Sequence, residues 1–575
     1  MEVEGMKGEK RPDTATYVAA IDQGTTSTRF IVYDTAAKVV VSHQLEFTQI
    51  YPQAGDLLHM LLRIINSQYY ESIVFVENQL ISLGFVVCMF LEASTSTKWV
   101  EHDPMEILDT VRKAMEGALA KGKEKGLDIL DNLKAIGITN QRETTVIWSR
   151  STGKPYYNAV VWMDSRTSSI CRHLEKQHPE GGRRFVSTCG LPIHPYFSAT
   201  KILWLMEHVP EVKAGVESGD ALFGTIDTWL IWNLTGGLNA EEPVHVTDCT
   251  NAARTMLMDL TTLQWHEPTL KDLGIPRSIL PKIISNVELI GKVSEDWPFA
   301  GIQLAGCLGD QHAATLGQQC KAGEAKSTYG TGCFIVLNTG EQIVPSNHGL
   351  LTTISYKLGP DAPTNYALEG SIAIGGAAVQ WLRDNLGIIK SSSEIESLAK
   401  TVNNTGGVYF VPAFSGLFAP WWRDDARGVL VGITRYTNKA HIARATLESM
   451  CYQVKEVLTS MKADAGNIEA TVGGEFLLRV DGGATVNNLL MQLQADLLGS
   501  PVVRPVDIET TALGAAYAAG LAVGVWTKEQ IIEQGAVQEA PTVFHSQITD
   551  DERNKRCLSW NKAVERSFGL AELDF

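Results

Sequence analysis

The segment Tyr17-Val-Ala-Ala-Ile-Asp-Gln-Gly-Thr-Thr-Ser-Thr-Arg29 predicts a buried strand, a polar turn and the start of a second strand. Asp22, at the end of the buried strand, is placed to hold a hydrated Mg²⁺ beside phosphate oxygens. The turn adds a glycine that lets backbone amides approach an anion, hydroxyl donors and a cation: Gly24, Thr25, Thr26, Ser27 and Arg29. It is therefore a candidate phosphate site, and the alternative is a polar hairpin that only closes two strands.

Strands and helices alternate on both sides of this segment, which indicates an α/β fold. In the first half we expect strands over 29–33, 38–47, 133–139 and 144–148, and a helix over 104–121 that begins after the N-cap Asp103. In the second half we expect strands over 325–328, 333–338 and 476–480, and helices over 374–385, 441–461 and 512–522. Because each half opens with a strand, a Gly/Thr turn and a strand, the sequence suggests an internal duplication with its boundary near 317–322.

Three further motifs follow predicted strands. Asp310, at the start of a small-residue helix, can accept a proton from a hydroxyl nucleophile or only cap that helix. Asp481-Gly-Gly483 and Asn487 can seat a flat base and ribose, or form an ordinary glycine-rich turn. Arg142 and Glu143 can bind a small polyhydroxy substrate, or form a surface ion pair. No P-loop and no Gly-x-Gly-x-x-Gly occurs in the sequence, so a nucleotide site must rest on another fold.

Composition limits the class of protein. With 575 residues, 44% hydrophobic and 20% charged, the chain has the make-up of a packed soluble protein, and about 150 residues per domain would suggest three or four domains. A net charge of −16 provides no basic field for nucleic acid. Nine widely spaced cysteines without a Cys-x-x-Cys pair argue against a disulfide framework or a zinc site. Residues 1–16 have no apolar core, so we expect a disordered leader and a cytoplasmic protein.

Taken together, the motifs resemble a known family. Asp22-Gln-Gly-Thr-Thr26, Gly309-Asp-Gln311 and Asp481-Gly-Gly483 occur in the order of the two phosphate motifs and the adenosine motif of the actin/Hsp70/sugar-kinase ATPase superfamily. Within it, the chain resembles the FGGY carbohydrate kinases, and especially those that phosphorylate glycerol, over 138–145, 196–205, 223–232, 329–334, 428–433, 441–448 and 479–483. The resemblance covers 17–563 except 56–98. It implies two duplicated ribonuclease H-like domains, 17–318 and 319–575, with an active-site cleft between them.

The resemblance also implies roles for particular residues. The nucleotide phosphates would meet Thr25, Thr26, Ser27 and Arg29, and the rest of the nucleotide site would be Thr331, Gly376, Gln380, Gly483 and Asn487. The polar glycerol ligands would be Arg142, Glu143, Tyr196, Asp310 and Gln311, with Trp162 and Phe334 as an apolar wall. Asp310 would be the general base, and Asp22 and Asp310 would face the metal.

The implied activity is phosphorylation of glycerol to sn-glycerol 3-phosphate, with Mg²⁺ and ATP as cofactors. The expected partners are glycerol and ATP/ADP, in a homodimer or homotetramer without nucleic acid or stable membrane insertion. One alternative is an FGGY kinase for another polyol or sugar. The other is an Hsp70-like chaperone or actin-like filament, which would lack the set formed by Arg142, Glu143 and Tyr196.

One segment departs from the family pattern. Residues 56–98 separate Tyr51-Pro-Gln-Ala-Gly55 from Trp99-Val-Glu-His-Asp-Pro104, which relatives join directly, and they are richer in apolar residues than the rest of the chain. Their longest apolar run is shorter than the roughly 18–20 residues of a membrane span. Our hypothesis is translated non-coding sequence; the alternatives are a genuine surface insertion or a membrane hairpin.

Overall fold

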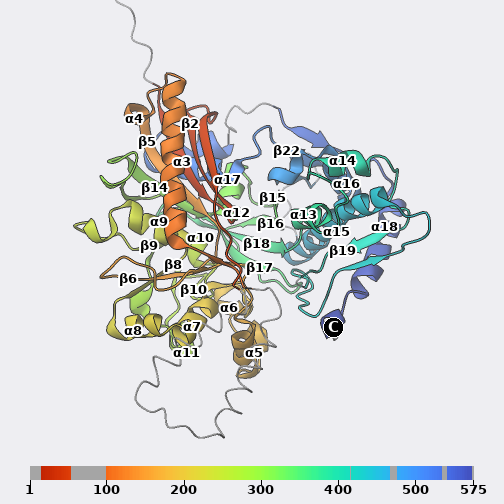
Figure 1. Cartoon of the computed structure of the whole chain (residues 1–575), viewed down its shortest axis with the longest axis horizontal. Helices are drawn as coiled ribbons and strands as arrows, with labels where there is room; N and C mark the ends of the chain where they lie inside the picture. Colours follow the sequence, from red (N-terminus) through yellow and green to blue (C-terminus); the bar gives the residue numbers. More distant parts are fainter. Residues whose placement is uncertain (1–14, 53–98, 415, 467–475, 534–539, 573–575) are drawn as a thin grey trace, which may run out of the picture.

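The computed structural model describes residues 15–52, 99–414, 416–466, 476–533 and 540–572. Two α/β halves lie side by side, the first coloured red to green and the second green to blue (Figure 1). The α/β class and the internal duplication predicted from the sequence are confirmed by the two sheets described below. The expected leader, apart from residues 15 and 16, and the whole of 56–98 lie outside the described residues.

The first sheet has the strand order β13-β14-β5-β1-β2-β3. β1, β2 and β3 pair antiparallel, whereas β5 pairs parallel with β1 and with β14. The strands are β1 (Tyr17–Gln23), β2 (Ser27–Asp34), β3 (Val39–Glu46), β5 (Leu133–Asn140), β13 (Leu289–Lys292) and β14 (Gln303–Gly309).

The second sheet repeats this plan in the order β17-β18-β16-β15-β21-β22-β23. β15, β16 and β18 pair antiparallel, whereas β21 pairs parallel with β15 and with β22. The strands are β15 (Ala325–Tyr329), β16 (Cys333–Gly340), β17 (Leu351–Lys357), β18 (Thr364–Ile372), β21 (Leu478–Asp481), β22 (Val502–Arg504) and β23 (Thr542–Phe544).

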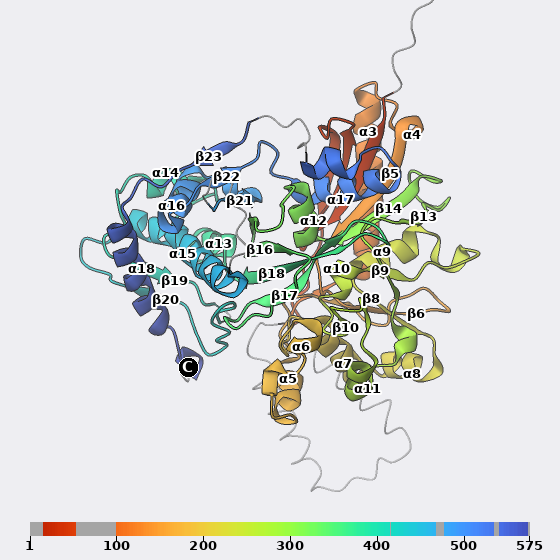
Figure 2. The same cartoon turned by 180° about the vertical axis from the view of Figure 1, so that it is seen from behind.

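Helices cover both faces of the first sheet. α3 (Pro104–Glu124) packs on β2 and β3, in front of the sheet in Figure 1. Its N-cap is Asp103, as predicted, whose carboxylate accepts a hydrogen bond from the Met105 amide at 2.8 Å. The opposite face is covered by α17 (Thr510–Ala522), which is seen in front of the sheet in Figure 2 and contacts β1, β5 and β14. A helix that follows the second sheet's β22 in the sequence thus completes the core of the first half.

Small residues explain how closely α17 packs. A Cβ at Gly137 of β5 would lie 2.1 Å from the carbonyl oxygen of Ala515, and one at Gly514 would lie 1.8 Å from that of Ala313 in α12 (Asp310–Gly317). Real side chains do not tolerate such distances. The glycines and alanines of the predicted 512–522 helix therefore permit the crossing of α12 and α17 between the two sheets.

The other helices build out each half. In the first half they are α4 (Ile129–Asn132), α5 (Ser168–Lys176), α6 (Val186–Cys189), α7 (Ser198–His208), α8 (Pro210–Ser218), α9 (Ile226–Leu234), α10 (Cys249–Ala252) and α11 (Glu267–Leu273). In the second half they are α13 (Gly376–Asp384), α14 (Glu394–Ala399), α15 (Lys439–Ala465), α16 (Asn488–Leu498) and α18 (Asp550–Glu565). None of the helices described is both long and apolar enough to cross a membrane.

The chain on either side of the 53–98 segment is joined locally. The Ile50 amide donates to the Glu101 carbonyl at 3.0 Å, and the Glu101 amide donates back at 2.9 Å. Glu101 belongs to the short strand β4 (Glu101–His102), which pairs with β7 (Ala159–Val160). The two flanks are therefore held together by backbone pairing that does not involve the segment.

Candidate active site

The predicted site residues of the first half meet at one edge of its sheet. β1, β5 and β14 run parallel, and their last residues are in register, with Gln23 opposite Asn140 and Asn140 opposite Gly309. The segments that follow these strands begin with Gly24, Gln141 and Asp310, so they emerge at the same edge. Motifs far apart in the sequence are thereby brought into one site.

The turn after β1 is a tight hairpin whose hydroxyl side chains range from the exposed Thr26 to the buried Ser27. The Gly24 amide donates to the Ser27 carbonyl at 2.9 Å, and Thr26 is exposed. Thr25 also contacts Trp162, whose indole nitrogen donates to the Thr25 Oγ1 at 2.9 Å. Arg29 Nη1 lies 2.8 Å from Glu509 Oε2 and 3.4 Å from Asp22 Oδ2.

Arg142 and Glu143 are buried, so the surface ion pair considered as an alternative is wrong. The Arg142 guanidinium donates twice to Glu369 of β18, with both distances 2.7 Å, and its Nε lies 3.1 Å from Asp310 Oδ1. Glu143 is ion-paired with Arg254 Nε, and its backbone adopts a positive φ of 58°. Few residues other than glycine adopt this conformation outside constrained sites.

The fit of Arg142 depends on Gly309. A Cβ at Gly309 would lie 2.7 Å from Arg142 Cγ and Cδ. Arg142 Nη1 also lies 3.1 Å from His312 Nε2, and burial beside this cation lowers the pKa of His312, which favours the neutral ring. The nitrogen can then accept a hydrogen bond from the guanidinium.

Asp310 remains partly open, with 26% of its side chain exposed. Burial raises the pKa of its carboxyl, while the cations of Arg142 and Lys326 lower it. The neighbouring Gln311 has its Oε1 occupied by Lys326 Nζ, which also donates to Thr328 Oγ1 at 2.9 Å. This orientation of the amide leaves the Gln311 NH₂ group as the donor available to a ligand.

Three aromatic rings border this group. The Trp162 ring lies 5.5 Å from Tyr196 and 5.6 Å from Phe334, measured between centroids. Phe334 comes from β16 of the second half, so both halves contribute to the aromatic surface. Tyr196 is buried, and burial next to Glu143 raises the pKa of its hydroxyl, which therefore stays protonated.

The predicted nucleotide residues of the second half form a separate group. The Thr331 carbonyl accepts hydrogen bonds from Gly375 at 2.8 Å and Ala377 at 3.0 Å, and α13 then carries Gly376 and Gln380. Gly483 follows β21 and is exposed, with open space where a Cβ would project. Asn487 caps α16 through its Oδ1, which accepts from the Leu490 amide at 2.9 Å and leaves its NH₂ group for a ligand. Among the described residues, no hydrogen bond joins this group to the hydroxyls of Thr25, Thr26 or Ser27.

Asp22 and Asp310 have the chemistry of a magnesium site. Burial raises the pKa of Asp22 to about 6, and Arg29 lowers it while Glu509 and Asp310 raise it further. Carboxylates that oppose each other's ionisation favour a cation between them. Mg²⁺ is commonly held by one or two carboxylates together with phosphate oxygens and water. The donor set therefore fits this ion.

A second acidic group, formed by Asp227, Asp248 and Cys307, is buried elsewhere in the first half. Protein donors already occupy these carboxylates. Asp248 Oδ2 accepts from Asn251 Nδ2 at 2.6 Å, and Asp227 Oδ2 accepts from Thr247 Oγ1 at 2.6 Å. Burial raises the pKa of Asp227, so a proton can replace a metal in this network.

Sequence reasoning missed three buried charges at the site: Arg254, Lys326 and Glu369. Arg254 and Glu369 stand in uncharged runs, such as Tyr366-Ala-Leu-Glu-Gly370 in β18, whereas Lys326 follows Glu324 by two residues. A buried charged side chain requires a hydrogen-bonding or charged partner. This requirement could have marked these three residues as members of a buried polar network.

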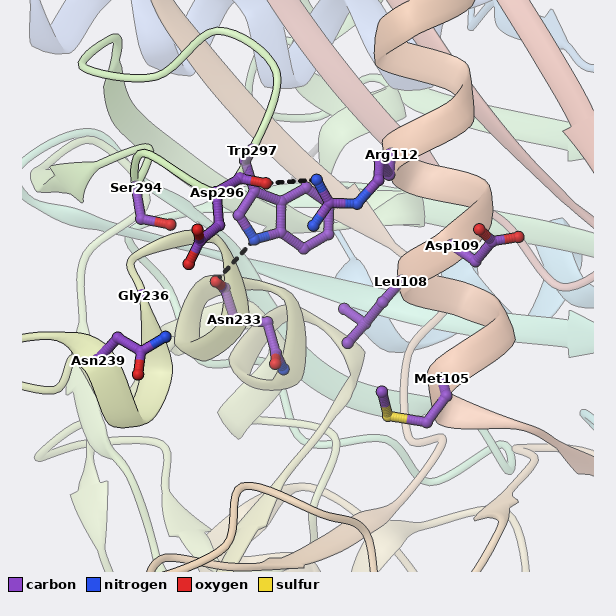
Figure 3. A pocket seen from close by; sticks show the side chains of 10 residues that line it. All are labelled: Met105, Leu108, Asp109, Arg112, Asn233, Gly236, Asn239, Ser294, Asp296 and Trp297. Carbon is purple, nitrogen blue, oxygen red and sulfur yellow. Dashed lines mark hydrogen bonds between the residues drawn. The ribbon is translucent and has the colours of Figure 1, made fainter.

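A surface pocket of about 360 Å³ lies away from this site, between α3, the end of α9 and the loop after β13 (Figure 3). The Arg112 guanidinium stacks 4.2 Å from the centre of the Trp297 ring and donates to the Asp296 carbonyl. The Trp297 indole nitrogen donates to the Asn233 carbonyl at 3.0 Å. No predicted site residue lines this pocket.

Comparison with known proteins links this arrangement to one family. The N-terminal domain of the FGGY family of carbohydrate kinases matches residues 17–89 and 89–317, and its C-terminal domain matches 325–523. The chain is 62% identical over 559 residues to a glycerol kinase of Arabidopsis thaliana, covering 97% of this chain and 98% of that protein. It is 50% identical over 558 residues to one of Brucella anthropi, covering 97% and 99%. The structure resembles that of Plasmodium falciparum glycerol kinase with ADP, with a TM-score of 0.77, 38% identity and coverage of 96% and 98%.

Proposed function

The chain belongs to the FGGY family of carbohydrate kinases, and we propose that it transfers the γ-phosphoryl group of ATP to a terminal hydroxyl of glycerol. One observation carries the proposal: Asp310 lies 3.1 Å from Arg142 at the edge of the first sheet, still partly open to a ligand. The glycerol kinases named above, which match nearly the whole chain, favour glycerol as the acceptor. ADP in the Plasmodium structure favours ATP as the donor.

In the proposed mechanism, Asp310 accepts the proton of the attacking hydroxyl. Its raised pKa makes it a better base than an exposed aspartate. Phosphoryl transfer depends chiefly on positioning and charge stabilisation. Arg142, Glu143 and the Gln311 amide orient the hydroxyls, so that one terminal oxygen faces the phosphate.

The hairpin hydroxyls and Arg29 would meet the phosphates, and the group around Thr331 and Gly483 would hold the nucleoside. Asp22 and Asp310 would hold Mg²⁺, which when bound supplies positive charge beside the phosphate oxygens. The rings of Trp162 and Phe334 would cover the carbon chain of glycerol and help to exclude water. We propose the domain limits 17–318 and 319–575 and a cytoplasmic homodimer or homotetramer as further expectations.

The test is ADP release by the purified protein with ATP and Mg²⁺, measured with and without glycerol and across a panel of polyols and sugars. We expect release that depends on glycerol and a product identified as sn-glycerol 3-phosphate. A larger kcat/KM for another polyol or sugar would favour the alternative FGGY kinase. ATP hydrolysis independent of any polyol would favour the chaperone or filament class.

A further inference from the structure

Five charged side chains form one continuous series of ion pairs beneath the proposed polyol site. The order is Glu143, Arg254, Glu369, Arg142 and Asp310. Arg254 pairs with Glu143 through Nε and lies 3.5 Å from Glu369 Oε1 through Nη2. Arg142 binds both Glu369 oxygens at 2.7 Å and reaches Asp310 Oδ1 at 3.1 Å. Glu369 is therefore the central member of the series.

Burial distinguishes the centre of the series from its open end at Asp310. The Glu369 and Arg254 side chains are 0% exposed, whereas 26% of the Asp310 side chain is exposed. A polyol can reach Asp310 but not Glu369, so Glu369 acts through its neighbours.

The geometry of Glu369 fixes the direction of the Arg142 guanidinium. Two parallel hydrogen bonds between a guanidinium and a carboxylate define a plane and an orientation. Glu369 is itself held in β18, where its backbone pairs with Val336 of β16 and Leu351 of β17. Arg142 follows β5 of the first half, so the pair joins the two halves of the chain.

Asp310 competes for the same cation. Its Oδ1 already lies 3.1 Å from Arg142 Nε. Without the two bonds to Glu369, the guanidinium would be free to turn toward Asp310 and form a bidentate pair with it. Such a pair would occupy the carboxylate that the proposed reaction requires as a base.

We propose that Glu369 is a positioning residue that holds Arg142 away from a bidentate pair with Asp310 and so keeps Asp310 open to the substrate hydroxyl. This inference rests on the proposed function. Arg254 extends the same framework to Glu143, the other buried polyol ligand. Glu369 belongs to the second half, so the polyol ligands of the first half are oriented by its partner half.

The decisive variant is Glu369→Asp, which retains the charge but shortens the side chain by one methylene. Glu369→Gln, the second variant, retains the length but removes the charge. The matched control is Glu448→Asp, because Glu448 is another buried glutamate of the second half, ion-paired with Arg444 at 3.3 Å and Arg556 at 3.9 Å. For each full-length protein, kcat and KM are measured for glycerol and ATP, together with the thermal unfolding midpoint and glycerol binding by calorimetry.

We expect both Glu369 variants to lose about 10- to 100-fold in kcat/KM for glycerol, the scale of a misplaced catalytic group, with the KM for ATP little changed. The Glu448→Asp control should match the unmodified protein in both constants. If Glu369 only neutralised charge, Glu369→Asp would be nearly normal, and that result overturns the proposal.

Equal losses for glycerol and ATP, or a Glu369→Asp chain that does not fold, would likewise overturn it, because either result assigns the carboxylate to the general stability of the fold. If only Glu369→Gln fails to fold, the Glu369→Asp result decides. An unmodified protein without glycerol-dependent activity would refute the proposed function instead, so the two failures can be told apart.

Discussion

The two halves share one strand plan but carry different chemistry at corresponding strand ends. β5 of the first half and β21 of the second both pair parallel with the opening strand of their sheet. β5 leads into the buried pair Arg142 and Glu143, whereas β21 leads into Gly482 and Gly483. The duplicated scaffold thus presents charged side chains on one side and exposed backbone on the other. The strand plan sets where these residues stand, and the residues that follow each strand set which chemical groups are presented there.

The two halves also differ in which strand carries a buried aspartate near its end. Asp22 of β1 lies opposite Thr139 of β5, whereas Thr328 of β15 lies opposite Asp481 of β21. The acid has thus changed strand between the halves. The Asp481 carboxylate accepts a hydrogen bond from Thr510 Oγ1 at 2.5 Å and another from Gln318. It ties α17 to the second sheet, whereas Asp22 lies beside Arg29 of the first hairpin, 3.4 Å from its Nη1.

The largest loss of activity should follow from removing Asp310, the proposed general base of the first half. Asp310→Asn keeps the shape of the side chain but cannot accept the substrate proton, so we expect kcat to fall at least about 100-fold. Glycerol binding by calorimetry is the control and should persist. Near-normal turnover would show that Asp310 is not the base.

A second test asks whether Arg142, in the first half, affects the binding of glycerol or the binding of ATP. Arg142→Lys retains the cation but loses the planar fork that binds Glu369, whereas alanine would leave that carboxylate buried and unpaired. We expect the KM for glycerol to rise roughly 10- to 100-fold, as for the loss of a charged hydrogen bond. The KM for ATP should change much less. Equal changes in the two constants would break the assignment of polyol binding to this half.

A third test concerns Gly482 and Gly483, the glycines that follow β21 in the second half. A Cβ at Gly483 meets open space, whereas one at Gly482, with φ of 88°, would lie 2.7 Å from the Tyr329 carbonyl oxygen. Gly483→Leu should therefore fold and place its side chain in the proposed nucleoside site. We expect the KM for ATP to rise about tenfold or more, which corresponds to about 1.4 kcal/mol. The KM for glycerol should stay near normal, and the opposite pattern would reverse the roles of the halves.

The smallest effect should come from deleting residues 56–98, a segment that contains none of the candidate site residues. Deleting residues 56–98 leaves the backbone pair of Ile50 and Glu101 in place. Shortening the connection changes the loop-closure free energy by only about 1–2 kcal/mol. We therefore expect activity to be retained and solubility to improve, as measured by turnover and by the soluble yield. Loss of activity would assign a function to the segment.

Sequence patterns predicted the elements whose signals are local. Asp103 and Pro104 marked the start of α3, and the strand before Asp22 is β1. Boundaries were less accurate where tertiary bonds decide them. The helix expected from residue 374 begins at Gly376, because the Gly375 and Gly376 amides donate to the turn after β15.

Motifs pointed to the candidate ligands, but no motif pointed to the buried residues that pair with them. Glu369 and Arg254 are isolated in sequence, and their partners Arg142 and Glu143 lie more than 100 positions away. Pairings at that separation depend on how the two sheets are placed, which no local pattern records. The packing of α17 on the first sheet was missed for the same reason, although its small residues were noticed.

Our central proposal is that the first half binds glycerol and the second half binds the nucleoside. The most direct test is a crystal structure of the protein with glycerol and a non-hydrolysable ATP analogue. We expect one terminal glycerol hydroxyl within hydrogen-bond distance of Asp310, about 2.6–3.2 Å, and in line with the γ-phosphate. The other hydroxyls should contact Arg142, Glu143 or Gln311, and the nucleoside should lie against Gly483. Glycerol bound away from Asp310, or a nucleoside held by the charged strand ends of the first half, would contradict the account.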